Sequence, residues 1–310
     1  MNYTFGIDVG GTNIKVGLFT ISNFSLIEKR EVPTPKENHM ESIFIESKRV
    51  MMEILEHQHL TLEDIHGVGF AVPCPVKNGY VVKCPNLNWI QLDIVKSVKN
   101  LLPSHIEVVV SNDANIAAYG ENYSLDTPLQ NAVFYTLGTG VGGGIIIDGK
   151  IVEGRTGAGG EIGHMPIFEG TEICGCGKTG CLEQICGTKA ILSYAKELST
   201  KYNSSIDFSH LTVKAVFDAA KQNDQIGSLV LDRVAEYIAL SASKLAVSLD
   251  PDIFIIGGGI AKAGNILIEK IEQHYQEYAR FGTIDVPFVL AKTGNDAGII
   301  GAAKYTMKSK

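Results

Sequence analysis

The chain has 310 residues, of which 45% are hydrophobic and 20% charged, and its formal net charge is −7. A chain of this length can bury a large core and is expected to fold as two lobes. The acidic balance argues against a nucleic-acid partner or a membrane surface, because both would need a basic face. Apolar runs fall well short of a membrane span and the N-terminus lacks a signal-peptide pattern, so we expect a cytoplasmic protein.

The first part of the chain alternates predicted strands and helices. Residues 5–20 indicate a strand, a tight turn and a returning strand, and residues 40–57 carry apolar side chains at helical spacing. Segments 65–73 and 107–113 are rich in β-branched residues and predict buried strands, the second of which leads into a helix. This order predicts an α/β protein with a mostly parallel or mixed layered sheet.

A second block begins at residue 131 and repeats the opening design of strand, Gly/Thr turn and strand. "GIDVGGT" near the N-terminus and "YTLGTGV" in this block are similar, which favours two related lobes. Residues 188–248 have a mainly helical pattern, and residues 251–265 predict a buried strand, a glycine-rich turn and a helix start. The sequence contains no flexible-linker composition, so the lobes are expected to pack together.

Three glycine-rich turns each follow a predicted buried strand: Gly10-Gly11-Thr12, Gly138-Thr139-Gly140 and Gly257-Gly258-Gly259. Glycine lets backbone amides face a ligand, although tight hairpins also use glycine for purely structural reasons. Three such turns together favour a polyphosphate site. No Walker loop occurs, and "GTGVGG" lies between two strands rather than before a helix, which disfavours a dinucleotide fold.

Two acidic residues, Asp8 and Asp113, lie at the ends of predicted strands, where they would face a cleft. Asp8 adjoins the first glycine turn and suits a Mg²⁺ partner that acts through water. Asp113 has two interpretations. It caps the following helix, a role that Ser111 and Asn112 also suit, or it accepts the proton of an alcohol that attacks a phosphoryl group.

Four of the six cysteines lie between residues 174 and 186, just after His164. Cys174, Cys176 and Cys181 offer three thiolates and His164 an imidazole, which together fill the closed tetrahedral shell of a structural Zn²⁺. Unconnected thiols in a loop are the alternative, and a thioredoxin-like C-x-x-C pair is absent. The other cysteines are expected to be ordinary small apolar side chains: Cys74, Cys84 and Cys186.

Two glutamates, Glu161 and Glu183, flank the cysteine cluster. Surface glutamates are common, but a metal that fixed this segment would fix both carboxylates as well. His164, bound to the metal through one nitrogen, can offer the other to a ligand. Acidic and imidazole groups around one pocket suit a polyhydroxylated neutral molecule, so a sugar-like ligand is expected.

Eight motifs occur along the chain in a fixed order: "DVGGTNIK", "PNLNW", "SNDANIAAYGE", "TLGTGVGGGII", "GAGGEIGHMPI", "CGCGKTGCLE", "IIGGGI" and "NDAGIIGAA". In this order they resemble the ROK family of bacterial sugar kinases over nearly the whole chain. The resemblance implies an α/β, actin-like (ribonuclease H-like) fold with a ligand cleft between two lobes. Residues 1–112, completed by the C-terminal helix 296–310, would form the small lobe, and residues 113–295, with the zinc-binding segment, the larger one.

The resemblance also implies an activity. Such a kinase uses ATP and Mg²⁺, carries structural Zn²⁺, is often a homodimer, and transfers the γ-phosphoryl group to the 6-hydroxyl of a hexose. Motifs 85–89 and 111–121 look most like the glucokinase branch. The alternatives are kinases for N-acetylmannosamine, N-acetylglucosamine, allose or fructose, or a non-catalytic sugar sensor. The family's repressors carry an N-terminal DNA-binding extension, for which the first motif leaves no room.

Individual residues match the family's motifs as follows. Asp113 matches the catalytic base. The family's sugar ligands are matched in this chain by Asn112, Asp113, Glu161, His164 and Glu183. The zinc ligands match His164, Cys174, Cys176 and Cys181. The nucleotide and phosphate site matches Asp8, Gly10, Gly11, Thr12, Asn13, Gly138, Thr139, Gly140, Gly257, Gly258 and Gly259. Cys74 replaces a glycine of many relatives in a loop beside the sugar, where a side chain would narrow the pocket near one hydroxyl.

Overall fold

A computed structural model describes residues 1–36 and 41–308, and the chain divides into two compact units. The first unit consists of Met1–Pro128, Ile151–Gly160 and Asn295–Lys310, and the second of Leu129–Lys150 and Glu161–Gly294. Within the described residues, none of the helices combines the length and apolar character needed to cross a bilayer. The lobe boundary expected between residues 112 and 113 stays a prediction.

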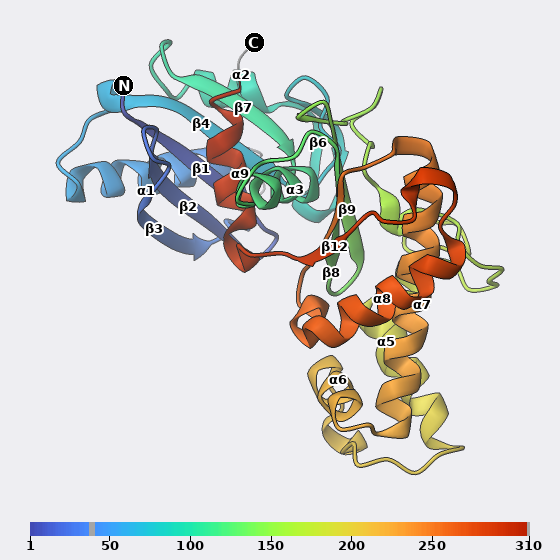
Figure 1. The fold of residues 1–310 in the computed structure, drawn as a ribbon. Helices are drawn as coiled ribbons and strands as arrows, with labels where there is room; N and C mark the ends of the chain where they lie inside the picture. The colour runs from blue at the N-terminus through green and yellow to red at the C-terminus, as the bar shows by residue number, and fades with distance from the viewer. Residues whose placement is uncertain (37–40, 309–310) are drawn as a thin grey trace. The chain divides into compact units, whose positions relative to one another are not determined.

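The first unit is built on a five-stranded mixed sheet with strand order β3-β2-β1-β4-β7 (Figure 1). Its strands are β1 (Tyr3–Val9), β2 (Asn13–Thr20), β3 (Leu26–Pro33), β4 (Ile65–Val72) and β7 (Glu107–Asn112). The first three pair antiparallel, whereas β1, β4 and β7 pair in parallel. β4, "IHGVGFAV", is buried along nearly its whole length, as expected for a parallel strand covered on both faces.

Among the described residues, four α-helices complete the first unit: α1 (Ser42–His57), α2 (Ile94–Lys99), α3 (Asp113–Tyr123) and α9 (Ala297–Tyr305). The apolar residues that predicted α1 are all buried, and residue 40, where that prediction began, lies outside the described residues. α9 lies directly on β1 and β4, beside α3 (Figure 1). This approach requires glycine, because a Cβ at Gly6 or Gly69 would overlap the backbone carbonyl of Ile299 or Ala302.

The second unit contains a sheet with the same strand order, and the pairings among β8, β9, β11 and β12 have the same senses as their counterparts in the first unit. Its strands are β8 (Ala132–Leu137), β9 (Val141–Ile147), β10 (Lys150–Ile151), β11 (Ile253–Gly257) and β12 (Phe288–Leu290), arranged β10-β9-β8-β11-β12. β8 pairs antiparallel with β9 and parallel with β11, which in turn pairs parallel with β12. The repeated design seen in the sequence is therefore a repeated sheet topology.

The helical pattern predicted after the cysteine segment is confirmed. The helices of the second unit are α4 (Glu183–Cys186), α5 (Thr188–Ser199), α6 (Val213–Lys221), α7 (Gln225–Leu249) and α8 (Asn265–Tyr278). α7 begins where the carboxylate of Asp224 accepts the amides of Ile226 and Gly227, a regular N-cap. Gly227 has no Cβ and so lets α7 pack closely on α6.

The remaining regular structure is short. A two-stranded antiparallel ribbon in the first unit is formed by β5 (Tyr80–Cys84) and β6 (Trp89–Asp93). The 3-10 turns span Leu62–Asp64, Pro85–Leu87, Ile162–His164, Phe208–His210, Ile260–Ala263, Phe281–Thr283 and Gly294–Asp296.

Candidate functional site

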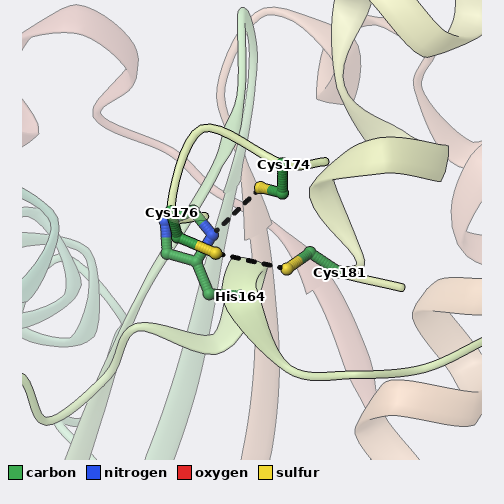
Figure 2. Close-up of side chains that lie close together, drawn as sticks. All are labelled: His164, Cys174, Cys176 and Cys181. Carbon is green, nitrogen blue, oxygen red and sulfur yellow. Dashed lines mark hydrogen bonds between the residues drawn. The ribbon is translucent and has the colours of Figure 1, made fainter. Parts of the chain in front are cut away.

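The four residues predicted to bind zinc lie together in the second unit. Their side chains point toward one another, and all four ligand atoms lie within 4.8 Å of each other (Figure 2). Sγ of Cys174 is 3.6 Å from Nδ1 of His164, and Sγ of Cys176 is 3.6 Å from Sγ of Cys181. A tetrahedral Zn²⁺ with ordinary bond lengths gives S···S and S···N edges of about 3.8 and 3.6 Å. The cluster therefore fits a closed four-coordinate zinc site.

The loop that carries the thiols closes through its own backbone. The amide of Cys174 donates to the carbonyl of Lys178 at 2.7 Å, and the amide of Gly177 donates back to the carbonyl of Cys174 at 2.8 Å. Gly177 has a φ of +85° and Gly180 a φ of +78°, values that favour glycine. The glycines of "CGCGKTGC" thus permit the tight wrapping that such close ligand spacing needs.

The thiols of the cluster differ in their environment. The backbone amide of Lys178 lowers the pKa of the exposed Cys176 thiol, whereas burial raises the pKa of the Cys181 thiol to about 12. A bound divalent cation displaces such thiol protons, because only the thiolate is a metal ligand. The donor set therefore suits Zn²⁺, and a bound cation would favour the charged form of the Cys181 sulfur.

Glu183 lies between this cluster and the second glycine turn. It is the first residue of α4, and its Oε2 accepts the backbone amide of Val141 at 3.0 Å. Its Oε1 lies 3.7 Å from Sγ of Cys174. A Cβ at Gly140 would overlap the carboxylate, so the absent side chain at that position makes room for Glu183. The role of Glu183 as a sugar ligand stays a prediction.

The other two predicted sugar ligands of the second unit belong to the same segment. Glu161 is exposed and precedes the 3-10 turn that ends at His164, and its carbonyl accepts the His164 amide at 3.1 Å. Because Nδ1 of His164 faces the thiols, Nε2 is the nitrogen that can face a ligand.

A pocket of about 560 Å³ in the second unit joins two of the glycine turns. Gly138 and Thr139 line it from one turn and Gly259 from another. Gly257 is buried against the ring of Phe134, whereas Gly259 is exposed with open space around its Cα. These two turns, which the sequence indicated as a ligand site, therefore line one cavity. On the 257–259 turn, Gly259 is the residue that lines it.

Two helices that the sequence argument did not include supply much of the pocket wall. The additional residues are Thr188, Leu192, Leu211, Thr212, Val213, Lys214, Phe217, Asp218, Lys221, Ile260, Lys262 and Ala263. Positions 214, 217, 218 and 221 have the i, i+3, i+4, i+7 spacing of one helix face. Both Lys214 and Lys221 pair with Asp218, at 2.5 and 3.3 Å. The sequence does contain a signal for this part of the pocket wall, namely two lysines on one face of a helix.

The first glycine turn lies in the first unit, beside a half-buried acid. The hydroxyl of Thr34 donates to the carbonyl of Gly10 at 2.6 Å, and the amide of Gly10 donates to the carbonyl of Asn13 at 2.9 Å. Asp8 ends up under this turn, against Gly298 at the start of α9. Gly11 and Thr12 are exposed, which leaves the tip of the turn open to a ligand.

The Asp8 carboxyl is electrostatically unusual. Burial raises its pKa above the usual range, the ammonium of Lys15 on the paired strand opposes that shift, and Glu31 and Asp296 add to it. A divalent cation beside Asp8 would favour the ionised form again. The acid, the turn and a Mg²⁺ with its water shell are chemically compatible.

Asn112 and Asp113 meet at the junction of β7 and α3 in the first unit. Asn112 is the N-cap, since its Oδ1 accepts the amides of Ala114 and Asn115 at 3.0 and 3.1 Å. Asp113 is the first helical residue, and its Oδ1 accepts the Ala114 amide at 2.7 Å. The structure therefore assigns the N-cap to Asn112, and the role of Asp113 as a base stays a prediction.

Cys74 and Cys84 form a disulfide, with Cα atoms 5.2 Å apart. The expectation that both are ordinary apolar thiols was wrong. The tight turn closed by Lys77 and Tyr80 turns the chain back so that Cys84, at the end of β5, meets the loop after β4. The Cys74 carbonyl lies 3.5 Å from Nδ2 of Asn112, which places this loop beside a predicted sugar ligand. Cys186, by contrast, is fully buried, and burial raises the pKa of its thiol.

The chain is similar to proteins of known fold and name. The model of the ROK family matches residues 4–309. A glucokinase of Halalkalibacterium halodurans is 36% identical over 307 residues, which cover 96% of this chain and 92% of that protein. An N-acetylmannosamine kinase of Vibrio cholerae is 30% identical over 308 residues, or 97% and 98% of the two chains.

A solved structure shares the fold. The crystal structure of a ROK family glucokinase from Streptomyces griseus in complex with glucose and AMPPNP superimposes with a TM-score of 0.75 at 27% identity, covering 99% of this chain and 100% of that one. The two mixed sheets described above therefore form an actin-like fold, as the sequence predicted.

Proposed function

Because the chain belongs to the ROK family of sugar kinases, we propose that it transfers the γ-phosphoryl group of ATP to the 6-hydroxyl of a hexose, with glucose as its substrate. The observation that carries the proposal is the pocket of the second unit, where the 138–140 and 257–259 turns meet lysines of α6. Backbone amides of glycine turns and nearby ammonium groups are the donors that a nucleotide polyphosphate requires. The 36% identical glucokinase of Halalkalibacterium halodurans supports glucose as the acceptor.

In this proposal, Asp113 accepts the proton of the 6-hydroxyl as that oxygen attacks the γ-phosphorus. Asp113 is the first residue of α3, and its carboxylate is the group that would serve as the base. Asn112, Glu161, His164 and Glu183 orient the sugar through hydrogen bonds to its hydroxyl groups. Phosphoryl transfer depends mainly on position and charge, so few other catalytic groups are required.

The glycine turns and Asp8 are assigned to the nucleotide. Gly10, Gly11, Thr12 and Asn13, and the 138–140 turn, are assigned to the phosphates, and Asp8 would hold Mg²⁺ through its water shell. When bound, that Mg²⁺ neutralises charge on the phosphate oxygens. Zn²⁺ at the four-ligand cluster has a closed shell and acts on the structure of the segment. A homodimer in the cytoplasm, with no nucleic-acid or membrane partner, completes the proposal.

A panel of hexoses, with ADP production as the readout, tests this function. We expect Mg²⁺-dependent turnover with the largest kcat/KM for glucose. The 30% identical N-acetylmannosamine kinase makes that amino sugar the second candidate, so its preference over glucose would move the substrate and keep the reaction. Binding of a sugar without turnover of any member of the panel would contradict the kinase and favour a sugar sensor.

A further inference from the structure

We propose that the metal-binding segment also positions the nucleotide turn, through Glu183 and Thr188. These two residues follow the metal ligand Cys181 closely in the chain, and both contact the backbone of the 138–141 turn. The inference rests on the proposed nucleotide site and adds a role for this segment beyond the sugar. It assigns Glu183 and Thr188 as positioning residues of the turn.

The first contact is made by the Glu183 carboxylate. Its Oε2 accepts the Val141 amide at 3.0 Å, where the turn re-enters β9. Gly140 leaves the space that the carboxylate occupies. Glu183 does not line the nucleotide pocket, whereas Gly138 and Thr139 do. Its effect on a nucleotide must therefore pass through the turn.

The second contact is made by Thr188, the first residue of α5. Its amide and its hydroxyl both donate to the carbonyl of Gly138, at 3.0 and 2.8 Å. Within the turn, the Gly138 amide donates to the carbonyl of Gly140 at 2.9 Å. The Gly138 carbonyl thus accepts two hydrogen bonds from Thr188 of α5. These bonds set the orientation of that peptide group and of the neighbouring amides.

The connection from the metal to these contacts is short and well packed. Leu182, between Cys181 and Glu183, is fully buried and donates its amide to the carbonyl of Met165 at 3.0 Å. The Gly187 amide closes α4 on the carbonyl of Glu183 at 2.9 Å. A Cβ at Gly187 would lie only 3.1 Å from the Thr139 carbonyl, so this short helix lies against the turn. A metal that fixes Cys181 thereby limits the movement of Glu183 and Thr188.

The physical effect is preorganisation. A turn that is already held in its binding conformation loses less conformational freedom when the nucleotide binds, so its affinity is higher. Loss of one such hydrogen bond should cost a few-fold in affinity rather than abolish binding, because a net hydrogen bond contributes about 1 kcal/mol, or roughly fivefold.

Calorimetric titration of the zinc-loaded chain with Mg²⁺–AMPPNP, in the absence of sugar, tests the inference. Glu183→Leu removes the acceptor of the Val141 amide, whereas Glu183→Gln keeps a carbonyl oxygen in its place. We expect about fivefold weaker binding for Glu183→Leu and nearly full recovery for Glu183→Gln. Elemental analysis must show unchanged zinc in each variant that is compared.

Substitutions of Thr188 provide a second test of the inference. This test decides the outcome if Glu183→Leu loses its zinc or does not fold. Thr188→Val removes the hydroxyl at nearly constant shape, and Thr188→Ser restores it. Thr200→Val is the matched control, because Thr200 donates to the carbonyl of Glu197 at 2.8 Å at the other end of α5. We expect weaker binding for Thr188→Val alone.

The outcomes separate this inference from the proposed function. Failure of the unaltered chain to bind Mg²⁺–AMPPNP would contradict the nucleotide site itself, and the inference with it. Normal binding by Thr188→Val and by a zinc-loaded Glu183→Leu would overturn only the inference. An equal loss in Thr200→Val, or no recovery in Thr188→Ser, would also overturn it, since either result indicates a general effect on α5 or on packing.

Discussion

The Gly10–Thr12 turn of the first unit and the Gly138–Gly140 turn of the second are built alike. Each joins the first two antiparallel strands of a five-stranded mixed sheet. In each, a threonine hydroxyl from later in the chain donates to the carbonyl of the first glycine, Thr34 at 2.6 Å and Thr188 at 2.8 Å. The repeated topology therefore extends to the contact that fixes the turn.

The two turns differ in what else surrounds them. The second is held by Glu183, next to the cysteine cluster, whereas the first lies beside the half-buried carboxyl of Asp8. Among the residues that the structure describes, His164 and the three thiols are the one group assembled for a metal. The two turns thus share one hairpin design but differ in their contacts. The turn of the second unit is also held by the Glu183 carboxylate, whereas the turn of the first unit has an exposed tip and Asp8 beneath it.

The largest effect is expected at Asp113, which belongs to the first unit. Asp113→Asn removes the proposed base while leaving a side chain of the same shape, so kcat should fall about a thousandfold. Affinity for AMPPNP should not change, because the pocket residues all belong to the second unit. Steady-state kinetics and calorimetry measure the two quantities. Near-normal turnover would show that Asp113 is not the base.

Loss of the metal should affect the second turn and leave the first intact. Cys176→Ser replaces an exposed ligand, so the zinc content should fall from one per chain to almost none without direct damage to the core. We expect the unfolding temperature to fall by about 5–10 °C, since metal binding stabilises the folded segment. Ile173→Ser, on the same loop and exposed, is the control. Unchanged zinc in Cys176→Ser would refute the ligand assignment.

Adding a methyl group to each of the two glycine turns tests whether the turns differ in how closely other residues pack against them. Gly140→Ala would force the Glu183 carboxylate aside and should lower the free energy of unfolding by about 1–3 kcal/mol. Gly11→Ala meets no atom within 4 Å, so its free energy of unfolding should stay within about 0.5 kcal/mol of the original. Denaturant titrations measure both. Equal losses at the two positions would contradict the difference in bracing.

The smallest effect concerns acid stability of the first unit. Burial alone would raise the pKa of Glu28, but hydrogen bonds from His57, Gln58 and Arg30 outweigh it and lower that pKa from 4.5 to about 2. The ionised carboxylate therefore stabilises the fold fully above pH 4.5, and this contribution is lost as the pH falls toward 2.

Comparison of Glu28→Gln with the original chain tests this dependence. The difference in unfolding free energy should be largest near neutral pH and should shrink as the pH falls below 4.5. Glu197→Gln in the second unit is the control, because the Glu197 carboxylate forms an exposed pair with Lys201, which contributes little. A Glu28→Gln difference that stays constant between pH 7 and pH 3 would contradict the account.

Local chemistry made much of this molecule predictable. β-Branched runs broken by glycine indicate buried strands, and the spacing of Cys174, Cys176 and Cys181 is constrained by the tetrahedral shell they must form. The motif order indicated the family, and with it the actin-like fold that the comparisons bear out.

The features that the sequence did not reveal depend on contacts that form only in the folded chain. The Cys74–Cys84 disulfide closes over the Lys77–Tyr80 turn that reverses the chain between them, and nothing in their spacing signals this. The Glu183 carboxylate reaches Val141 only once α4 lies against the turn. The pocket wall from α6 needed the tertiary structure to bring Lys214 and Lys221 beside Gly138.

Identification of the product tests the central claim most directly. Incubation of the chain with glucose and Mg²⁺–ATP, followed by phosphorus NMR, should show one sugar phosphate formed for each ADP, with the phosphate on the 6-hydroxyl. ADP that accumulates with free inorganic phosphate in place of a sugar phosphate, or no ADP with any hexose, would contradict the account.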